Sequence, residues 1–281
     1  MDDLFDFSVP EKRFTVMGNP ISHSKSPNIH SQFGQQTGIK LHYTTTQVDP
    51  GGFPSAVLNF QANGGSGLNI TVPFKVEAFE LADKLSKRAE YAGAVNTLRF
   101  EQNGDIYGDN TDGIGLVRDI RDNLGCSIKD ARILIIGAGG AVRGALLPLL
   151  EESPTEIVIA NRTVDKAMAL ARRFNDKGTI SGSSLTSVKG SFDIVINGST
   201  ASLKGAVPAI PEAAVSGARL VYDMMYSDQP TVFMQWAEKA GAARTVDGLG
   251  MLVEQAAEAF RIWNNVHPQT KSVMLSLRPN S

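Results

Sequence analysis

Four short apolar runs in the middle of the chain give the clearest structural signal in the sequence. Each is dominated by aliphatic residues without polar alternation, and they span residues 132–136, 156–160, 193–197 and 219–223. Such runs are typical of strands covered on both faces, as in a parallel sheet. Helical spacing at 164–174, between the second and third runs, and at 231–240, after the fourth, predicts an open α/β sheet with right-handed crossovers.

The first hundred residues also mix strand and helix patterns, although less regularly. We predict strands at 14–17, 42–48 and 67–72, the last ended by Pro73, and a helix over 76–90. The fold class expected is therefore α/β throughout, with the more regular alternation confined to the middle of the chain.

The change of pattern predicts two domains. An N-terminal α/β domain is expected to about residue 111, followed by a nucleotide-binding domain of Rossmann type over 112–247. A last helix is predicted at 250–264, where six apolar residues form one broad stripe. The pattern alone leaves open to which domain this helix belongs.

The composition is that of an ordinary globular protein. Of 281 residues, 42% are hydrophobic, and 27 basic against 29 acidic residues give a formal net charge of −2. This balance provides no strong basic field for nucleic acid or an anionic membrane. The acidic N-terminus lacks a signal-peptide pattern, and the longest apolar stretch, 133–142, is too short to span a bilayer. A single cysteine, Cys126, cannot form an intramolecular disulfide, and the four histidines lack metal-ligand spacing. We expect a cytoplasmic protein without a metal.

A glycine-rich turn follows the first of the four apolar runs. Residues 137–144 read Gly-Ala-Gly-Gly-Ala-Val-Arg-Gly and lead into an apolar helix. Glycines allow a tight turn and close backbone approach to a pyrophosphate, which the free N–H groups of the following helix then bind. Val142 stands at the third glycine position, and Pro148 is expected to kink the helix. A turn without a ligand is the alternative, but its strand-helix context favours dinucleotide binding.

The end of the next predicted strand indicates which dinucleotide is bound. NAD-binding folds usually place an acidic residue there, for the ribose 2′-hydroxyl. This chain instead has Asn161, Arg162 and Thr163, with Lys166 one turn later. Arginine presents a planar set of donors that fits a 2′-phosphate. The sequence therefore favours NADP over NAD, with solvated surface charges as the alternative.

Polar clusters at 18–27, 69–75, 93–98 and 108–113 lie at or beyond predicted strand ends, where open α/β sheets bind ligands. Taken singly, each has an ordinary structural explanation. Ser24 and Ser26 could cap a helix near Pro27, Asn96 could be a turn residue, Asp112 could cap a helix at 113–124, and Lys75 could be an exposed charge.

Taken together, these segments resemble the shikimate dehydrogenase family nearly end to end. The matching motifs are GNPIxHSxSP at 18–27, NxTxPFK at 69–75, GAVNT at 93–97, NTDGxG at 110–115, GAGGAxRG at 137–144, NRT at 161–163, YDMxY at 222–226 and DGLGMLVxQAA at 247–257. The resemblance implies a substrate-binding domain formed by 1–111 and 248–281, completed by the C-terminal helices, and an NADP-binding Rossmann domain over 112–247. It also implies a monomer or homodimer that acts on a small molecule in aromatic amino-acid biosynthesis.

The resemblance also implies roles for individual residues. Lys75 and Asp112 form the catalytic pair, and the substrate is held by these two together with Ser24, Ser26, Thr71, Asn96, Tyr226 and Gln255. The cofactor is held by Gly137, Ala138, Gly139, Gly140, Ala141, Val142, Asn161, Arg162, Thr163 and Lys166, while Met224 and Gly248 line the nicotinamide. Lys166 stands where the family often has Arg, so a bidentate phosphate contact is lost but the charge is kept. Residues 197–202 only approximate the family pattern and receive no role.

The implied reaction is the reversible reduction of 3-dehydroshikimate to shikimate. NADPH supplies a hydride, and an ammonium at Lys75, oriented by Asp112, supplies the proton to the ketone oxygen. Two small serines suit the flat carboxylate of shikimate better than that of quinate. The alternatives are an NAD-using quinate/shikimate paralogue, which an acidic residue at 161–163 would favour, and a catalytically silent NADP module, which loss of Lys75 or Asp112 would favour.

Overall fold

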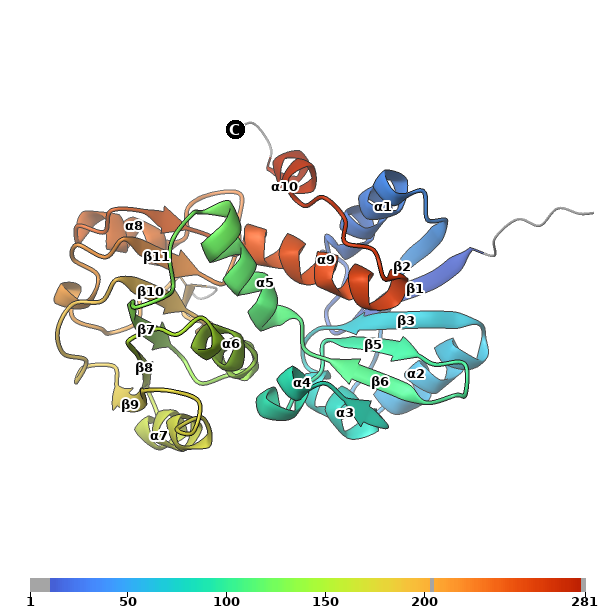
Figure 1. The fold of residues 1–281 in the computed structure, drawn as a ribbon, viewed down its shortest axis with the longest axis horizontal. Coiled ribbons are helices and arrows are strands. Elements are labelled where there is room, and N and C mark those ends of the chain that lie inside the picture. The colour runs from blue at the N-terminus through green and yellow to red at the C-terminus, as the bar shows by residue number, and fades with distance from the viewer. Residues whose placement is uncertain (1–10, 203–204, 279–281) are drawn as a thin grey trace, which may run out of the picture.

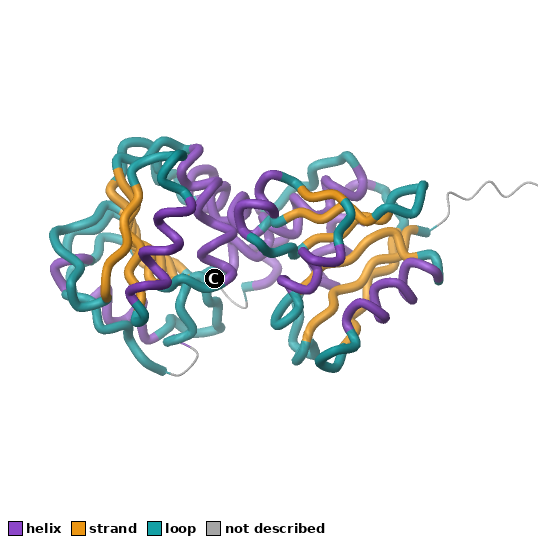
Figure 2. Tube along the Cα trace, turned by 90° about the horizontal axis from the view of Figure 1, so that it is seen from below, coloured by secondary structure: helices purple, strands orange, loops and turns teal. Residues whose placement is uncertain are grey.

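The computed structural model describes residues 11–202 and 205–278 and contains two sheets that lie side by side. Helices α5 (Asp112–Arg118) and α9 (Leu249–Asn264) run between them, as Figures 1 and 2 show from two directions. Each sheet has its own hydrophobic core. The two-sheet α/β organisation predicted from the sequence is therefore confirmed.

The first sheet is six-stranded, in the order β2-β1-β3-β5-β6-β4, and every strand except β5 runs in the same direction. Its strands are β1 (Lys12–Gly18), β2 (Leu41–Gln47), β3 (Gly65–Ile70), β4 (Lys84–Leu85), β5 (Thr97–Phe100) and β6 (Ile106–Asp109). The helices between them are α1 (Ser26–Thr37), α2 (Phe53–Ala62), α3 (Lys75–Leu81) and α4 (Lys87–Ala92).

The second sheet is entirely parallel, in the order β12-β11-β10-β7-β8-β9. This is the order of a Rossmann fold, whose ligand crevice lies where the direction of strand succession reverses, here between β7 and β10. Its strands are β7 (Arg132–Ile136), β8 (Glu156–Asn161), β9 (Ile180–Ser184), β10 (Ile194–Asn197), β11 (Leu220–Asp223) and β12 (Thr245–Val246). Its helices are α6 (Gly140–Glu151), α7 (Val164–Arg173), α8 (Val232–Lys239) and the short 3₁₀ turn η3 (Glu212–Ala214).

The C-terminal helices α9 and α10 (Lys271–Leu277) return to the first sheet. The apolar stripe of α9 packs with Ile29 and Phe33 of α1, and Val273 of α10 joins the same cluster. Near the end of α9, Trp263 stacks on Phe14 of β1 with ring centroids 4.4 Å apart. Most of the apolar stripe of α9 thus packs against elements of the first sheet.

Two of the predicted elements differ in the structure. The single helix predicted over 76–90 is wrong: α3 ends at Leu81, and Lys84–Leu85 pairs with β6 as an edge strand. Backbone bonds to β6, such as Asp83 N–H to the carbonyl of Ile106, outweigh the helical pattern there. Ser86 then caps α4 by accepting a bond from the N–H of Ala89 at 3.1 Å.

Two shorter differences concern strand and helix ends. The strand predicted to reach residue 72 ends at Ile70, so that Thr71 and Val72 lie in the following loop. The helix predicted over 113–124 is α5 followed by a π-helical turn, η1 (Asp119–Asn123). Helix α6 continues through Pro148 to Glu151.

Candidate active site

Lys75 and Asp112 form a close ion pair between two helix starts. Lys75 is the first residue of α3 and Asp112 the first of α5. Lys75 Nζ lies 2.5 Å from Asp112 Oδ2, and the two side chains are 22% and 10% exposed. Asp112 makes no helix-capping bond from its side chain, because the cap position belongs to Thr111. The pairing therefore excludes both ordinary readings of these residues, a free surface lysine and a helix cap.

Asn96 holds the second oxygen of the same carboxylate. Its amide nitrogen donates to Asp112 Oδ1 at 2.8 Å and to Thr111 Oγ1 at 3.0 Å. Its amide oxygen accepts from the backbone N–H of Thr111 at 2.9 Å. Asn96 is 2% exposed, so these bonds form out of water and fix the carboxylate firmly. Asp112 thus presents one oxygen to Lys75 and the other to Asn96.

The topology of the first sheet explains why these residues meet. Strands β1, β3 and β6 are parallel, so their carboxyl ends share one edge. Ser24 and Thr71 lie in the loops that follow β1 and β3, and Asp112 begins the helix that follows β6. Strand β5 is antiparallel, so the residue that precedes it, Asn96, lies at that edge as well. Distant segments of the sequence therefore converge on one site.

All eight residues expected to hold the substrate line one cavity of about 350 Å³. This volume is within the range of small-molecule sites. The eight are Ser24, Ser26, Thr71, Lys75, Asn96, Asp112, Tyr226 and Gln255. Burial raises the pKa of Tyr226, which therefore remains a neutral donor and acceptor. Met224 and Gly248, expected to line the nicotinamide, are part of the same wall.

The glycine turn lies next to this cavity. It connects β7 to α6, and Gly137 has φ +109°, a left-handed conformation that favours glycine. A Cβ on Gly139 would meet no atom within 4 Å, and α6 has no side-chain cap at this end. No side chain therefore caps this end of α6, and the space beside Gly139 is open, as a pyrophosphate bound by the N–H groups of the first turn would require.

Close packing links this turn to the cavity wall. A Cβ on Gly198, after β10, would lie 2.5 Å from Val142 Cγ2 and 3.1 Å from the sulfur of Met224. Met224 in turn abuts Gly248, where a Cβ would clash with the Met224 carbonyl oxygen. Val142 is fully buried in the core, so its departure from the third glycine of the motif serves packing.

The cations predicted to bind a 2′-phosphate follow β8, the neighbour of β7. Arg162, Thr163 and Lys166 are exposed, and Asn161 Nδ2 donates to the carbonyl of Thr163 at 2.9 Å. Within residues 11–202 and 205–278, neither Arg162 nor Lys166 has an ion-pair partner. The residues present at this strand end therefore fit a phosphate.

Asn69 is a cavity residue to which the sequence analysis gave no role. It is 6% exposed, accepts a bond from the Tyr43 hydroxyl at 2.8 Å and donates to Thr97 Oγ1 at 3.1 Å. Its signal was present in the sequence, since it is the first residue of the 69–75 motif. His23 and Lys25, in the loop before α1, also line the cavity.

Family models match most of the chain. The shikimate dehydrogenase substrate binding domain matches residues 16–98, the shikimate/quinate 5-dehydrogenase model matches 119–215, and the shikimate 5′-dehydrogenase C-terminal domain matches 248–276. The chain belongs to the shikimate dehydrogenase family. This membership agrees with the motif resemblance found in the sequence.

Individual relatives align over nearly the full length. The shikimate dehydrogenase (NADP(+)) of Marinobacter nauticus is 54% identical over 94% of this chain and 98% of its own. The crystal structure of an Ael1 enzyme from Pseudomonas putida superposes with a TM-score of 0.91 at 46% identity, covering 96% of this chain and 99% of that one. The shikimate 5-dehydrogenase of Thermus thermophilus, solved with NADP(H) and shikimate, has a TM-score of 0.82 at 28% identity, covering 94% and 98%.

Two kinds of feature do not occur among the described residues. No helix within 11–202 or 205–278 combines the length and hydropathy needed to cross a membrane. In the same ranges, no three His, Cys, Asp or Glu side chains come together in the manner of a metal site.

Proposed function

We propose that this protein is an NADP-dependent shikimate dehydrogenase, which reversibly reduces 3-dehydroshikimate to shikimate in aromatic amino-acid biosynthesis. The observation that carries the proposal is the Lys75–Asp112 pair, which lines a cavity that is also lined by Met224 and Gly248, the residues that adjoin the glycine turn. We place the domain boundaries at 111/112 and 247/248, and the protein in the cytoplasm as a monomer or homodimer.

Lys75 is the proton donor in the direction of reduction. When bound, NADPH supplies the hydride. The Lys75 ammonium donates a proton to the ketone oxygen as negative charge develops there, and in the reverse direction the neutral amine accepts the hydroxyl proton. Asp112 Oδ2 orients the ammonium through the 2.5 Å contact, and Asn96 fixes the carboxylate from its other side.

The remaining polar residues bind and orient the substrate. Ser24, Ser26 and Tyr226 hold the carboxylate of shikimate at one end of the cavity. Thr71 and Gln255, which both line the cavity, hydrogen-bond its ring hydroxyls. Two small serine side chains suit the planar carboxylate-bearing carbon of shikimate and favour it over the bulkier quinate.

The domain built on the second sheet holds the cofactor. Backbone N–H groups of the 137–142 turn bind the pyrophosphate, and Asn161, Arg162, Thr163 and Lys166 bind the adenosine ribose and its 2′-phosphate. The absence of a carboxylate at this strand end favours NADP over NAD.

The test is turnover of the purified protein with shikimate and with quinate, each with NADP and with NAD, followed by reduced-nicotinamide absorbance. We expect the fastest oxidation with shikimate and NADP. Faster oxidation of quinate with NAD would favour the paralogue instead. No turnover in any of the four combinations would favour a silent cofactor-binding module.

A further inference from the structure

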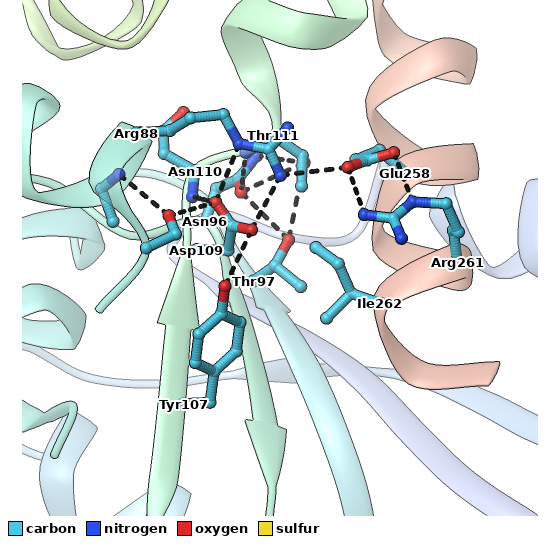
Figure 3. Close-up of polar contacts among 12 residues, drawn as sticks. Arg88, Asn96, Thr97, Tyr107, Asp109, Asn110, Thr111, Glu258, Arg261 and Ile262 are labelled. Atoms are coloured by element: carbon cyan, nitrogen blue, oxygen red, sulfur yellow. Dashed lines mark hydrogen bonds and ion pairs between the residues drawn. The ribbon is translucent and has the colours of Figure 1, made fainter. Parts of the chain in front are cut away.

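A buried ion network lies directly behind the substrate cavity. Arg88 of α4 contacts two carboxylates at once, Asp109 at the end of β6 and Glu258 of α9, as Figure 3 shows. Its Nη2 lies 2.7 Å from Asp109 Oδ2 and 3.0 Å from Glu258 Oε1, and its Nε donates to Asp109 Oδ1 at 3.1 Å. Arg88 therefore bridges the first sheet and the helix that returns from the second.

One end of this bridge leads to the catalytic carboxylate. Asp109 Oδ1 accepts a bond from the N–H of Asn110 at 2.7 Å. Asn110 Oδ1 in turn accepts from the N–H of Asp112 at 3.2 Å, and its amide donates to the carbonyl of Ala94 at 3.0 Å. The turn that presents Asp112 to Lys75 is thus bonded, residue by residue, to the carboxylate that Arg88 holds.

The other end leads to a substrate-binding side chain. Glu258 follows Gln255 by three residues on α9, so the two lie on the same side of the helix. Gln255 Oε1 lies 3.4 Å from both Asn96 Nδ2 and Thr111 Oγ1. The network therefore joins the two elements that bring Asp112 and Gln255 to the same amide nitrogen of Asn96.

Glu258 is held in its charged form at physiological pH. The side chains of Asp109 and Glu258 are only 3% and 2% exposed. Burial alone would raise the pKa of Glu258, but the bond from Arg261 and the charges of Arg118 and Arg88 lower it to about 2. Buried ion pairs often stabilise a fold no better than apolar residues of similar size do. A gain in stability therefore does not explain this arrangement well. A requirement to fix the relative positions of β6 and α9 explains it better.

We propose that Arg88 is a positioning residue whose bridge between Asp109 and Glu258 sets the places of Asp112 and Gln255 around the bound substrate. The inference rests on the proposed function, since it concerns catalysis at the same cavity. Arg88 is absent from the residues that line the cavity, so it acts through the two carboxylates. A planar guanidinium with a fixed fork of donors suits this task better than a lysine ammonium does.

The test compares Arg88→Met and Arg88→Lys with the matched control Arg261→Met. Arg261 pairs with the same Glu258, at 2.8 Å, but makes no ion pair with Asp109 and is 42% exposed. We expect Arg88→Met to lower kcat/KM for shikimate by roughly 10- to 100-fold, the scale of a small misplacement of reacting groups. We expect the Kd of NADP, from quenching of protein fluorescence, to stay within about twofold, because the glycine turn is untouched. Arg261→Met should change kcat/KM by less than about threefold.

Arg88→Lys distinguishes the effect of the guanidinium geometry from the effect of the positive charge. It also tests the inference if Arg88→Met fails to fold. It keeps the cation but loses the fork, so we expect an unfolding temperature near that of the wild type together with a loss of at least about fivefold in kcat/KM. A larger primary isotope effect with 4-deuterated NADPH should accompany the loss, because hydride transfer becomes slower. Unchanged kcat/KM in Arg88→Lys, or equal losses in Arg88→Met and Arg261→Met, would overturn the inference. Wild-type protein that fails to oxidise shikimate would instead overturn the proposed function.

Discussion

The contact between Lys75 and Asp112 predicts that the two residues act as a unit. Nζ and Oδ2 lie 2.5 Å apart, and neither side chain has a second ion-pair partner within the described parts of the chain. Lys75→Ala removes the proposed proton donor, and Asp112→Asn keeps the shape of its side chain but leaves the ammonium without its orienting charge. Each single change should lower kcat by about 100-fold, the usual scale for a lost acid-base group.

The double variant distinguishes coupled from independent roles. A 100-fold loss corresponds to about 2.7 kcal/mol, so two independent losses would sum to about 5.4 kcal/mol, or roughly 10,000-fold. If Asp112 acts only through Lys75, removing both should cost no more than the worse single change, about 100-fold.

The assay is steady-state oxidation of shikimate by NADP at saturating concentrations of both. Lys84→Ala is a suitable control, because Lys84 forms a similar pair with Asp105, at 2.6 Å, that is exposed and outside the cavity. Its kcat should remain near that of the wild type. Near-normal turnover in Lys75→Ala, or multiplicative losses in the double variant, would refute the assignment of a coupled pair.

Two further predictions concern the cofactor and the pH dependence of stability. Arg162→Gln should raise KM for NADP by roughly 10- to 100-fold and leave KM for NAD unchanged. The control Arg172→Gln, on the exposed face of α7, should change neither KM value. Equal effects of Arg162→Gln on both cofactors would contradict phosphate binding. Burial lowers the pKa of His30 from 6.5 to about 3. Between these two pH values the unfolded chain therefore binds one more proton at His30 than the folded protein does. The free energy of unfolding should accordingly fall by about 1.4 kcal/mol per pH unit as the pH drops below 6.5. The free energy of unfolding of His30→Phe, measured with denaturant, should lack this pH-dependent loss. Parallel dependences on pH in the wild type and His30→Phe would contradict the prediction.

The second sheet was predictable because its strands are buried on both faces and therefore nearly continuous in apolar residues. All four predicted runs are strands, with ends that differ by one residue at most. The first sheet was harder, because β5 and β6 carry polar residues that bond within the structure. Thr97, for example, is fully buried and donates to Asn96, a contact that no sequence pattern indicates.

The site was predictable as a set of residues but not as a geometry. The motifs singled out all eight residues expected to hold the substrate, and these line one cavity, yet only the antiparallel direction of β5 explains how Asn96 reaches Asp112. The Arg88 network had no signal in the sequence, since Arg88 and Glu258 are 170 residues apart. Lone charged residues are usually solvated, and their burial becomes evident only once the elements pack.

The 110–115 motif is short, but its two glycines allow α5 to pack closely against both α6 and α9. A Cβ on Gly113 would clash with the carbonyl oxygen of Gly144 in α6, and one on Gly115 would lie 2.7 Å from the backbone nitrogen of Gln255 in α9. Helix α5 therefore touches α6, the helix after the glycine turn, with one glycine and α9 with the other. Because Asp112 begins this helix, the spacing between α6 and α9 and the position of the proposed catalytic carboxylate are set by the same three residues, Asp112, Gly113 and Gly115. A larger side chain at either glycine would push backbone against backbone, and the resulting shift would move Asp112 relative to α6 or α9.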